Sequence, residues 1–382
     1  MVILLKKWFV SALVLVVFWC AVPTVSAREQ PALSAASAIL YEPTSGRVLY
    51  EKNADEQRAM ASTTKLMTAL IAADWCDPEQ EIIVPDEATR VEGSSLGLRA
   101  GDYLTMRDLL TGLLLASGND AANVVALTVC DTVEQFAELM NARAARLGME
   151  NTRFVTPSGL DADGHYTTAR DMAKLAQAVL EHPLLADICA MPRATVHIGN
   201  PKTARTIQNH NRLLTAYPGT VGLKTGYTQK AGRCLVSAVE RDGVTLIAVT
   251  LRAPDDWNDH QALYEYGFDQ VALVDLVLPH LSELAVGGGT VDAVALTAPT
   301  PEKQVLPIDR QDHVDVTILL PRFVFAPVEA GDAIGELIYT LDGKELCRLP
   351  ILAATSSDAR PTVSDQERFC RNLRWILYTI LG

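Results

Sequence analysis

The 382-residue sequence lacks the short patterns that mark most metal sites. Its seven histidines form no H-E-x-x-H helix pattern, and its seven cysteines form no C-x-x-C pair. These absences argue against a structural zinc site and against a zinc peptidase. The G-x-S-x-G pattern of α/β-hydrolases occurs at residues 93–97, but in a loop of small residues and not at a strand-to-helix turn, so we do not expect that fold. We therefore expect neither a metal nor any other cofactor.

Positive charge is scarce as well. The chain has 33 Lys and Arg residues against 46 Asp and Glu, a formal net charge of -13. A protein that binds phosphate backbones needs basic clusters, so this balance argues against a nucleic-acid partner. The composition is otherwise that of a globular chain, with 49% hydrophobic and 21% charged residues, and its length allows two domains or more.

The first 27 residues have the order of a secretory signal peptide. Lys6 and Lys7 precede an apolar stretch from Trp8 to Val22, and small residues end at Ala27. We predict cleavage after Ala27 and export, with an uncleaved anchor as the alternative. Export permits disulfides among the six remaining cysteines, but several lie in apolar runs where a buried free thiol is the usual state.

The pattern of apolar residues predicts an α+β domain over residues 28–272. A hairpin is expected at 36–41 and 47–51, and three later strands at 220–225, 234–240 and 244–251 are expected to join it in one antiparallel sheet. Between them, apolar periodicity and the capping residues Thr105, Thr132 and Thr168 predict a group of helices, namely 62–75, 106–116, 121–130, 133–147 and 169–182, the last closed by Pro183. Residues 81–84 are a candidate for a short strand.

Helical signals fade after this region. Short β-prone runs with scattered prolines predict a small β domain over residues 276–354, followed by a linker over 355–367. Residues 368–382 form an amphipathic pattern with apolar positions on one helical face and arginines beside it. The segment is too short to span a bilayer, so we expect it to lie in the interface of an anionic membrane. The alternative is a helix that packs on the protein's own surface.

One stretch suggests chemistry by itself: Ser62 and Lys65 lie three residues apart at the start of an apolar run. On a helix this spacing places both side chains on one face, about one turn apart. The surrounding apolar residues predict that Lys65 is buried, which lowers the pKa of its amine and suits it to act as a base for Ser62. The alternative is that Ser62 only caps the helix.

Two further stretches complete a recognisable set: Ser117-Gly118-Asn119 and Lys224-Thr225-Gly226. The first falls between two predicted helices and the second on a predicted strand. Together with Ser62-x-x-Lys65 they match the serine-lysine acyl-transfer set of penicillin-binding proteins and class A β-lactamases, with Gly118 where the usual second motif has Asp.

On these motifs the chain resembles the D-alanyl-D-alanine carboxypeptidases, the low-molecular-weight penicillin-binding proteins of the S11 serine peptidase family. The resemblance also covers Gly93-Ser94-Ser95, the continuation Asp120-Ala121-Ala122 of the second motif, the run 159–173, the β domain and the amphipathic tail. It implies a penicillin-binding or β-lactamase-like transpeptidase fold, a peptidoglycan stem peptide as substrate and β-lactams as covalent inhibitors. Residues 253–260 are similar to the spore-associated branch of the family.

The resemblance and the chemistry together assign catalytic roles to three residues. Ser62 is the nucleophile, Lys65 takes its proton, and Ser117 pairs with Lys224 to relay a proton to the leaving nitrogen. Asn119 is expected to orient Lys65 and the substrate amide. His165 is expected to stabilise a loop.

The remaining predicted site residues bind the substrate. Lys224 and Thr225 are expected to hold the terminal carboxylate, and Gly226 leaves room for a substrate backbone beside the strand. The backbone N–H groups of Ser62 and Tyr227 are expected to stabilise the oxyanion.

Three alternatives use the same fold. A β-lactamase would need a group that activates water for deacylation, and no E-x-x-x-N segment lies between the second and third motifs. A wall-binding protein without activity would not need the motif residues. An endopeptidase acting on cross-links would use the same residues.

Overall fold

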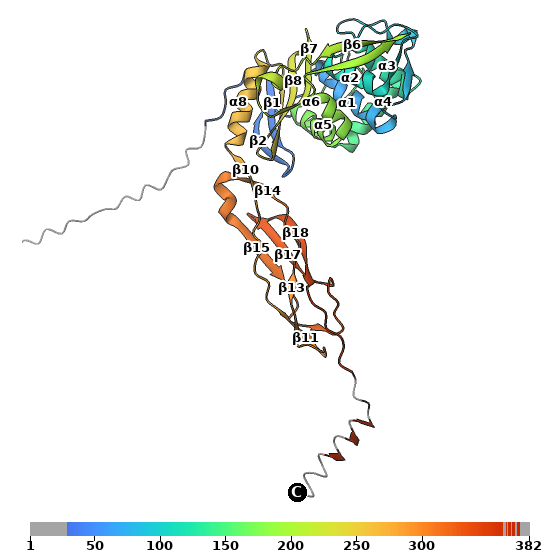
Figure 1. Cartoon of the computed structure of the whole chain (residues 1–382). Helices are drawn as coiled ribbons and strands as arrows, with labels where there is room; N and C mark the ends of the chain where they lie inside the picture. Colours follow the sequence, from blue (N-terminus) through green and yellow to red (C-terminus); the bar gives the residue numbers. More distant parts are fainter. Residues whose placement is uncertain (1–28, 362–363, 365, 368, 371–372, 375–382) are drawn as a thin grey trace, which may run out of the picture.

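The computed structural model describes residues 29–361 without a break, and after them residues 364, 366–367, 369–370 and 373–374. The predicted leader and most of the predicted terminal helix lie outside the described residues. Figure 1 shows an α+β region followed by an elongated region made of strands. In the described part of the chain, no helix is long and apolar enough to cross a membrane.

A five-stranded antiparallel sheet organises the α+β region, with strand order β2-β1-β9-β8-β7. The pairing of β1 with β9 confirms that the N-terminal hairpin joins the late strands in one sheet. The strands are β1 (Ser37–Glu42), β2 (Arg47–Lys52), β7 (Thr220–Thr228), β8 (Gly232–Arg241) and β9 (Val244–Leu251).

The two faces of this sheet carry separate cores because side chains alternate along each strand. Ile39 and Val249 face a core shared with the helices, whereas their neighbours Leu40 and Ala248 face a second core. That second face is covered by α8 (Asp256–Phe268), and Figure 1 shows α8 on the opposite side of the sheet from the helical group.

The helical group consists of α1 (Lys65–Trp75), α2 (Met106–Leu115), α3 (Asn119–Val129), α4 (Val133–Arg146), α5 (Ala169–Glu181) and α6 (Pro183–Ala190). Three predicted caps are confirmed: the side chains of Thr105, Thr132 and Thr168 each accept a backbone N–H three residues later. Pro183 was expected only to close α5, but it also opens α6, because proline lacks an N–H that the first helical position does not need.

Several elements were not predicted because their sequences have no strong apolar pattern. Among them are α8, which buries Asp256, Asp259 and His260, and the short α7 (Leu213–Ala216). A four-stranded sheet beside the helices also escaped prediction except for its first strand. Its strands are β3 (Glu81–Ile83), β4 (Tyr103–Thr105), β5 (Arg193–Gly199) and β6 (Lys202–Gln208).

The C-terminal domain is built only from strands and one 3₁₀ segment, η3 (Ile308–His313), as far as the structure describes it. Its strands form small sheets over two small cores. Strand β10 crosses the predicted boundary at 272 and pairs with β14. The strands are β10 (Val271–Val274), β11 (Leu284–Gly287), β12 (Ala293–Val294), β13 (Leu296–Thr297), β14 (Gln304–Pro307), β15 (Val314–Leu319), β16 (Val324–Phe325), β17 (Ala333–Leu341) and β18 (Lys344–Ala353).

The first half of the predicted linker belongs to this domain. Ser357 and Val328 exchange two backbone hydrogen bonds, and the backbone N–H of Arg360 donates to Gly288 O. The composition of 355–360 suggested a linker, but backbone pairing does not depend on side-chain type and could not be seen there. The six described cysteines are free thiols, and two of them, Cys189 and Cys234, are buried as expected for cysteines in apolar runs.

Candidate active site

Ser62 lies on a strained turn in front of the first long helix. The turn η1 (Ala61–Thr64) is a 3₁₀ segment, so the helix predicted from Ser62 begins as an α-helix only at Lys65. Ala61 has a φ of 48°, a left-handed conformation that costs free energy for a residue with a side chain. This turn presents a half-buried Ser62 beside Lys65.

Lys65 is fully buried and its amine touches three oxygens. Its Nζ lies 2.8 Å from Ser62 Oγ, 2.7 Å from Asn119 Oδ1 and 2.6 Å from Ser158 O. Burial lowers the pKa of Lys65 well below its usual value, and the nearby Lys224 lowers it further. The predicted burial of Lys65 is therefore confirmed, and burial favours the neutral form of its amine.

The three contacts also orient the lone pair of a neutral Lys65. A neutral amine has two N–H donors and one lone pair, and the oxygens of Asn119 and Ser158 are carbonyl oxygens that can only accept. Both N–H groups are thus used on these two oxygens. The lone pair then faces the Ser62 hydroxyl, which is the arrangement that a general base needs.

Asn119 is fixed from both ends of its amide. Its Oδ1 accepts from Lys65, and its Nδ2 donates to Glu92 O at 2.7 Å. Helix α3 begins at Asn119 and not at Ala121 as predicted, so Asn119 stands in the first turn of a helix and not in a loop. Gly118 makes this early start feasible because a side chain there would meet Asp120 Oδ1 at 2.8 Å.

Asp120 ties the loop 95–98 to the start of α3. Its buried carboxylate accepts from Ser95 Oγ at 2.6 Å and from the backbone N–H groups of Leu96, Gly97 and Leu98 at 2.8 to 3.0 Å. Four donors satisfy a buried carboxylate that would otherwise be costly. The sequence showed Asp120 only as part of the resemblance to the family.

Ser117 is buried and, like Ala61, has a left-handed backbone, with a φ of 60°. The predicted hydroxyl-amine pair between Ser117 and Lys224 is not formed among the described hydrogen bonds. Lys224 Nζ instead donates to Thr225 O at 3.0 Å, because a fully buried amine takes the acceptor within its reach. Burial lowers the pKa of Lys224 to about 7.

The other predicted substrate-binding residues follow Lys224 on the edge strand β7. Thr225 is half-buried and Tyr227 is 66% exposed. A Cβ at Gly226 would lie 3.0 Å from Ser62 N and 3.1 Å from Met60 O, so only glycine lets the strand approach the nucleophile turn this closely. The structure thus brings the Ser62 turn, Asn119 and β7 to one place.

Sequence reasoning assigned no role to two contributors, Ser158 and Gly159, although Gly159 opens the run 159–173 of the family resemblance. The carbonyl of Ser158 orients Lys65, and Gly159, with a φ of +84°, lets the chain pass directly beside the nucleophile turn. A Cβ at Gly159 would lie 1.9 Å from Ala61 O. The small-residue sequence Pro157-Ser158-Gly159 was the available signal for a tight turn, but a backbone acceptor has no signature of its own.

His165 supports the same turn, as expected for a loop-stabilising residue. Its Nδ1 accepts the Val155 N–H at 3.0 Å, so the proton of the neutral ring is on Nε2, which donates to Thr64 Oγ1 at 2.9 Å. Thr64 Oγ1 in turn donates to Ala61 O at 2.8 Å. Burial lowers the pKa of His165 to about 4, which keeps this tautomer neutral.

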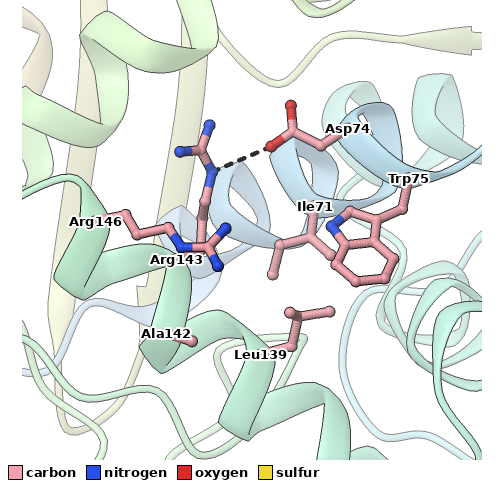
Figure 2. A pocket seen from close by; sticks show the side chains of 7 residues that line it. All are labelled: Ile71, Asp74, Trp75, Leu139, Ala142, Arg143 and Arg146. Atoms are coloured by element: carbon pink, nitrogen blue, oxygen red, sulfur yellow. Dashed lines mark ion pairs between the residues drawn. The ribbon is translucent and has the colours of Figure 1, made fainter.

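A pocket of about 250 Å³ lies elsewhere, between α1 and α4, at the opposite end of α1 from Lys65 (Figure 2). Trp75, Leu139 and Arg146 are among its lining residues, and Arg143 Nε lies 3.1 Å from Asp74 Oδ2 at its edge. None of the site residues line it, so this pocket is separate from the active site. Within the described part of the chain, no cluster of His, Cys, Asp and Glu could hold a metal ion.

A serine beside a buried lysine, an asparagine that fixes that lysine and an edge strand bearing Lys-Thr-Gly define a serine-lysine acyl-transfer enzyme with the penicillin-binding transpeptidase fold. The family described as D-alanyl-D-alanine carboxypeptidase, peptidase S11, matches residues 24–255, and the C-terminal domain of penicillin-binding protein 5 matches residues 277–358. The chain belongs to the S11 D-alanyl-D-alanine carboxypeptidase family and is a serine peptidase.

Similar proteins agree with this assignment along most of the chain. D-alanyl-D-alanine carboxypeptidase DacF of Bacillus subtilis is 31% identical over 84% of this chain and 85% of its own length. DacC of Escherichia coli is 32% identical over 86% and 87%. The structure of penicillin-binding protein 5 from Haemophilus influenzae superposes with a TM-score of 0.66 at 26% identity, over 86% of this chain and 98% of that protein.

Proposed function

We propose that the chain removes the terminal D-alanine from peptidoglycan stem pentapeptides through an acyl-enzyme on Ser62. The observation that carries this proposal is the buried Lys65 amine, 2.8 Å from Ser62 Oγ, with its two N–H groups directed to carbonyl oxygens. The family relationship supplies the class of substrate.

Acylation begins when Ser62 Oγ attacks the carbonyl carbon between the last two D-alanines while Lys65 takes the hydroxyl proton. The C–N bond then breaks, the proton passes to the leaving nitrogen through the Ser117 hydroxyl, and free D-alanine departs. Water attacks the ester, Lys65 takes a proton from this water, and the shortened peptide leaves with Ser62 Oγ protonated again. The backbone N–H groups of Ser62 and Tyr227 bind the oxyanion in both steps.

Lys224 and Thr225 select a substrate with a free terminal carboxylate. The Lys224 ammonium is buried behind the edge strand, so its interaction with a carboxylate is little screened by water. An anion bound nearby raises the pKa of Lys224 above its value of about 7 and keeps it charged. The Thr225 hydroxyl adds a hydrogen bond to the same carboxylate.

The same Ser62 attack opens a β-lactam ring and leaves penicillin bound as an ester. In this case the leaving nitrogen stays attached to the acyl group, and no E-x-x-x-N segment is present to activate water for fast release. We therefore infer a lasting covalent adduct and no efficient turnover of penicillin.

We also propose that the protein works outside the cytoplasm in wall maturation, with a spore-associated role suggested by the sequence 253–260. The leader-like residues 1–27 support export. The amphipathic residues 368–382 support peripheral attachment to the outer face of the cytoplasmic membrane. In the described part of this tail, Phe369 and Leu373 are exposed.

The decisive experiment measures D-alanine release from a pentapeptide and uptake of labelled penicillin by wild type, Ser62→Ala and the control Ser282→Ala, an exposed serine of the C-terminal domain. We expect Ser62→Ala to lose both activities, the first by at least about 10⁴-fold, and Ser282→Ala to keep them. A wild type without either activity would indicate a wall-binding protein. Many turnovers of penicillin would indicate a β-lactamase, and faster cleavage of cross-linked peptides than of pentapeptide would indicate an endopeptidase.

A further inference from the structure

Two phenylalanines of the C-terminal domain are exposed and touch each other. Phe323 is 49% and Phe325 is 73% exposed, and their rings meet edge to face with centroids 5.1 Å apart. Val291 nearby in the fold is 44% exposed. Exposure of apolar side chains to water is unfavourable, so a cluster of them on the surface indicates a site where a partner covers them.

The three residues, which we call the aromatic tip, lie at one end of the domain. Strand β16 pairs in parallel with β11, which places Phe325 opposite Gly287, and the Ser357 hydroxyl accepts from Val291 N at 3.4 Å. A Cβ at Gly287 would lie 3.2 Å from the Phe325 ring. Figure 1 shows β11 at the end of the domain farthest from the α+β region.

The chain leaves the domain at this same end. Arg360 N donates to Gly288 O at 2.9 Å, and Ala359 pairs with Gly289. The predicted amphipathic tail begins eight residues after Arg360 in the sequence, and 22 residues follow Arg360 in all. Eight residues extend at most about 30 Å, so a membrane surface bound by the tail is within reach of the tip.

Charges at the tip favour an apolar contact with a polar rim. Arg360 is paired with Asp292 at 2.6 Å, so neither leaves an isolated charge there. Arg322, next to Phe323, is exposed and can keep its guanidinium in water while its stem follows the rings into an apolar layer.

We propose that the aromatic tip inserts into the interface of a bilayer and forms a second membrane contact beside the tail. This proposal rests on the proposed membrane attachment. A single shallow anchor binds a membrane weakly and reversibly, whereas two linked contacts bind far more tightly because the second contact is made at a high effective concentration. Burying two phenyl rings supplies the free energy of the second contact.

The test measures binding of the mature chain, residues 28–382, to vesicles of phosphatidylcholine and phosphatidylglycerol. We expect Phe323→Ser with Phe325→Ser to lower the partition coefficient roughly tenfold, the loss of one apolar contact. Val277→Ser is the matched control, because Val277 is 80% exposed in the same domain but lies beside Tyr339, away from the tip. This control is expected to bind like wild type.

A tail variant, Phe369→Ser with Leu373→Ser, separates the two proposals. If only the tail variant loses binding, the aromatic tip makes no membrane contact and this inference is wrong, while the proposed attachment stands. If wild type does not bind vesicles, both are wrong. Self-association of wild type through the tip, measured by sedimentation and lost in the phenylalanine variant that still binds vesicles normally, would show that a second copy covers the rings. D-alanine release in solution is expected to be unchanged in every variant.

Discussion

The α+β region and the C-terminal domain differ in what they bury. The α+β region keeps two lysines, Lys65 and Lys224, and the carboxylate of Asp120 at no more than 1% exposure. Among the described residues after 276, the one buried polar residue is Ser357. The hydrophobic cores also differ in size: the core on the helical face of the large sheet is extensive, whereas the C-terminal domain has two small cores.

This difference shows where the molecule can sustain chemistry. A buried ionisable group costs free energy that only extensive packing and well-placed hydrogen bonds can offset. Around Lys65 these are the contacts to Asn119 and Ser158. The C-terminal domain has no comparable core, and its exposed phenylalanines suit it to surface binding.

The largest expected effect comes from Lys65→Arg. Arginine keeps the positive charge but stays protonated, so it cannot take the Ser62 proton. We expect kcat/KM for D-alanine release to fall by about 10²- to 10⁴-fold, the usual contribution of a general base. Lys344→Arg, on the exposed β17–β18 turn, is the matched control and should be silent. Retained activity in the Lys65 variant with a normal melting temperature would assign the base to another group.

A pair of glycine substitutions compares the two regions directly. Gly159 and Gly343 both have a left-handed backbone, with φ values of +84° and +78°. At Gly159 an added Cβ would meet Ala61 O, whereas at Gly343 nothing lies within 4 Å. Gly343→Ala should therefore cost only about 1 kcal/mol of backbone strain and leave activity unchanged.

Gly159→Ala should cost about 3 kcal/mol and reduce kcat by about 10²-fold, because the clash displaces the Ser62 turn. Thermal unfolding and D-alanine release measure the two effects. If both substitutions lower the free energy of unfolding equally and Gly159→Ala keeps its activity, the Ser62 turn tolerates movement.

The sequence predicted the parts of the site that are local or carried by side chains. Ser62 and Lys65 are three residues apart, so helical spacing was enough to pair them. The approach of Lys224 and Asn119 followed only from the resemblance to a known family, since no local rule brings residues 54 or more positions apart together. Ser158 was missed because it acts through its carbonyl, which every residue has.

The fold, like the site, was predicted only where the sequence carries a local signal. The large sheet and the capped helices were predicted from alternation and from threonine caps. Strands β5 and β6 were not, because most of their residues are exposed and show no apolar alternation. The pairing of 355–360 with the domain depends on backbone hydrogen bonds between distant segments, which composition does not reveal.

The last expected effect concerns stability in acid and not the rate of the reaction. His165 and His260 are buried in the α+β region, and burial lowers their pKa values to about 4 and about 3. An unfolded histidine titrates near pH 6.5, so below that pH the unfolded chain binds protons that the folded region excludes. Each of the two histidines should therefore lower the free energy of unfolding of this region by about 1.4 kcal/mol per pH unit as the pH drops from 6.5 toward 4.

Calorimetry between pH 6.5 and 5 tests this expectation, and the C-terminal domain serves as the internal comparison. Its histidines, His280 and His313, are exposed, so its transition should move less. His165→Gln should remove one of the two proton contributions from the α+β transition. It should also lower kcat at neutral pH, because Thr64 and the Ser62 turn lose the Nε2 donor, whereas His260→Gln should change only stability. If both transitions shift equally with pH and neither substitution changes the shift, the histidines are not the cause. The acid sensitivity would then come from surface carboxylates, which both regions carry.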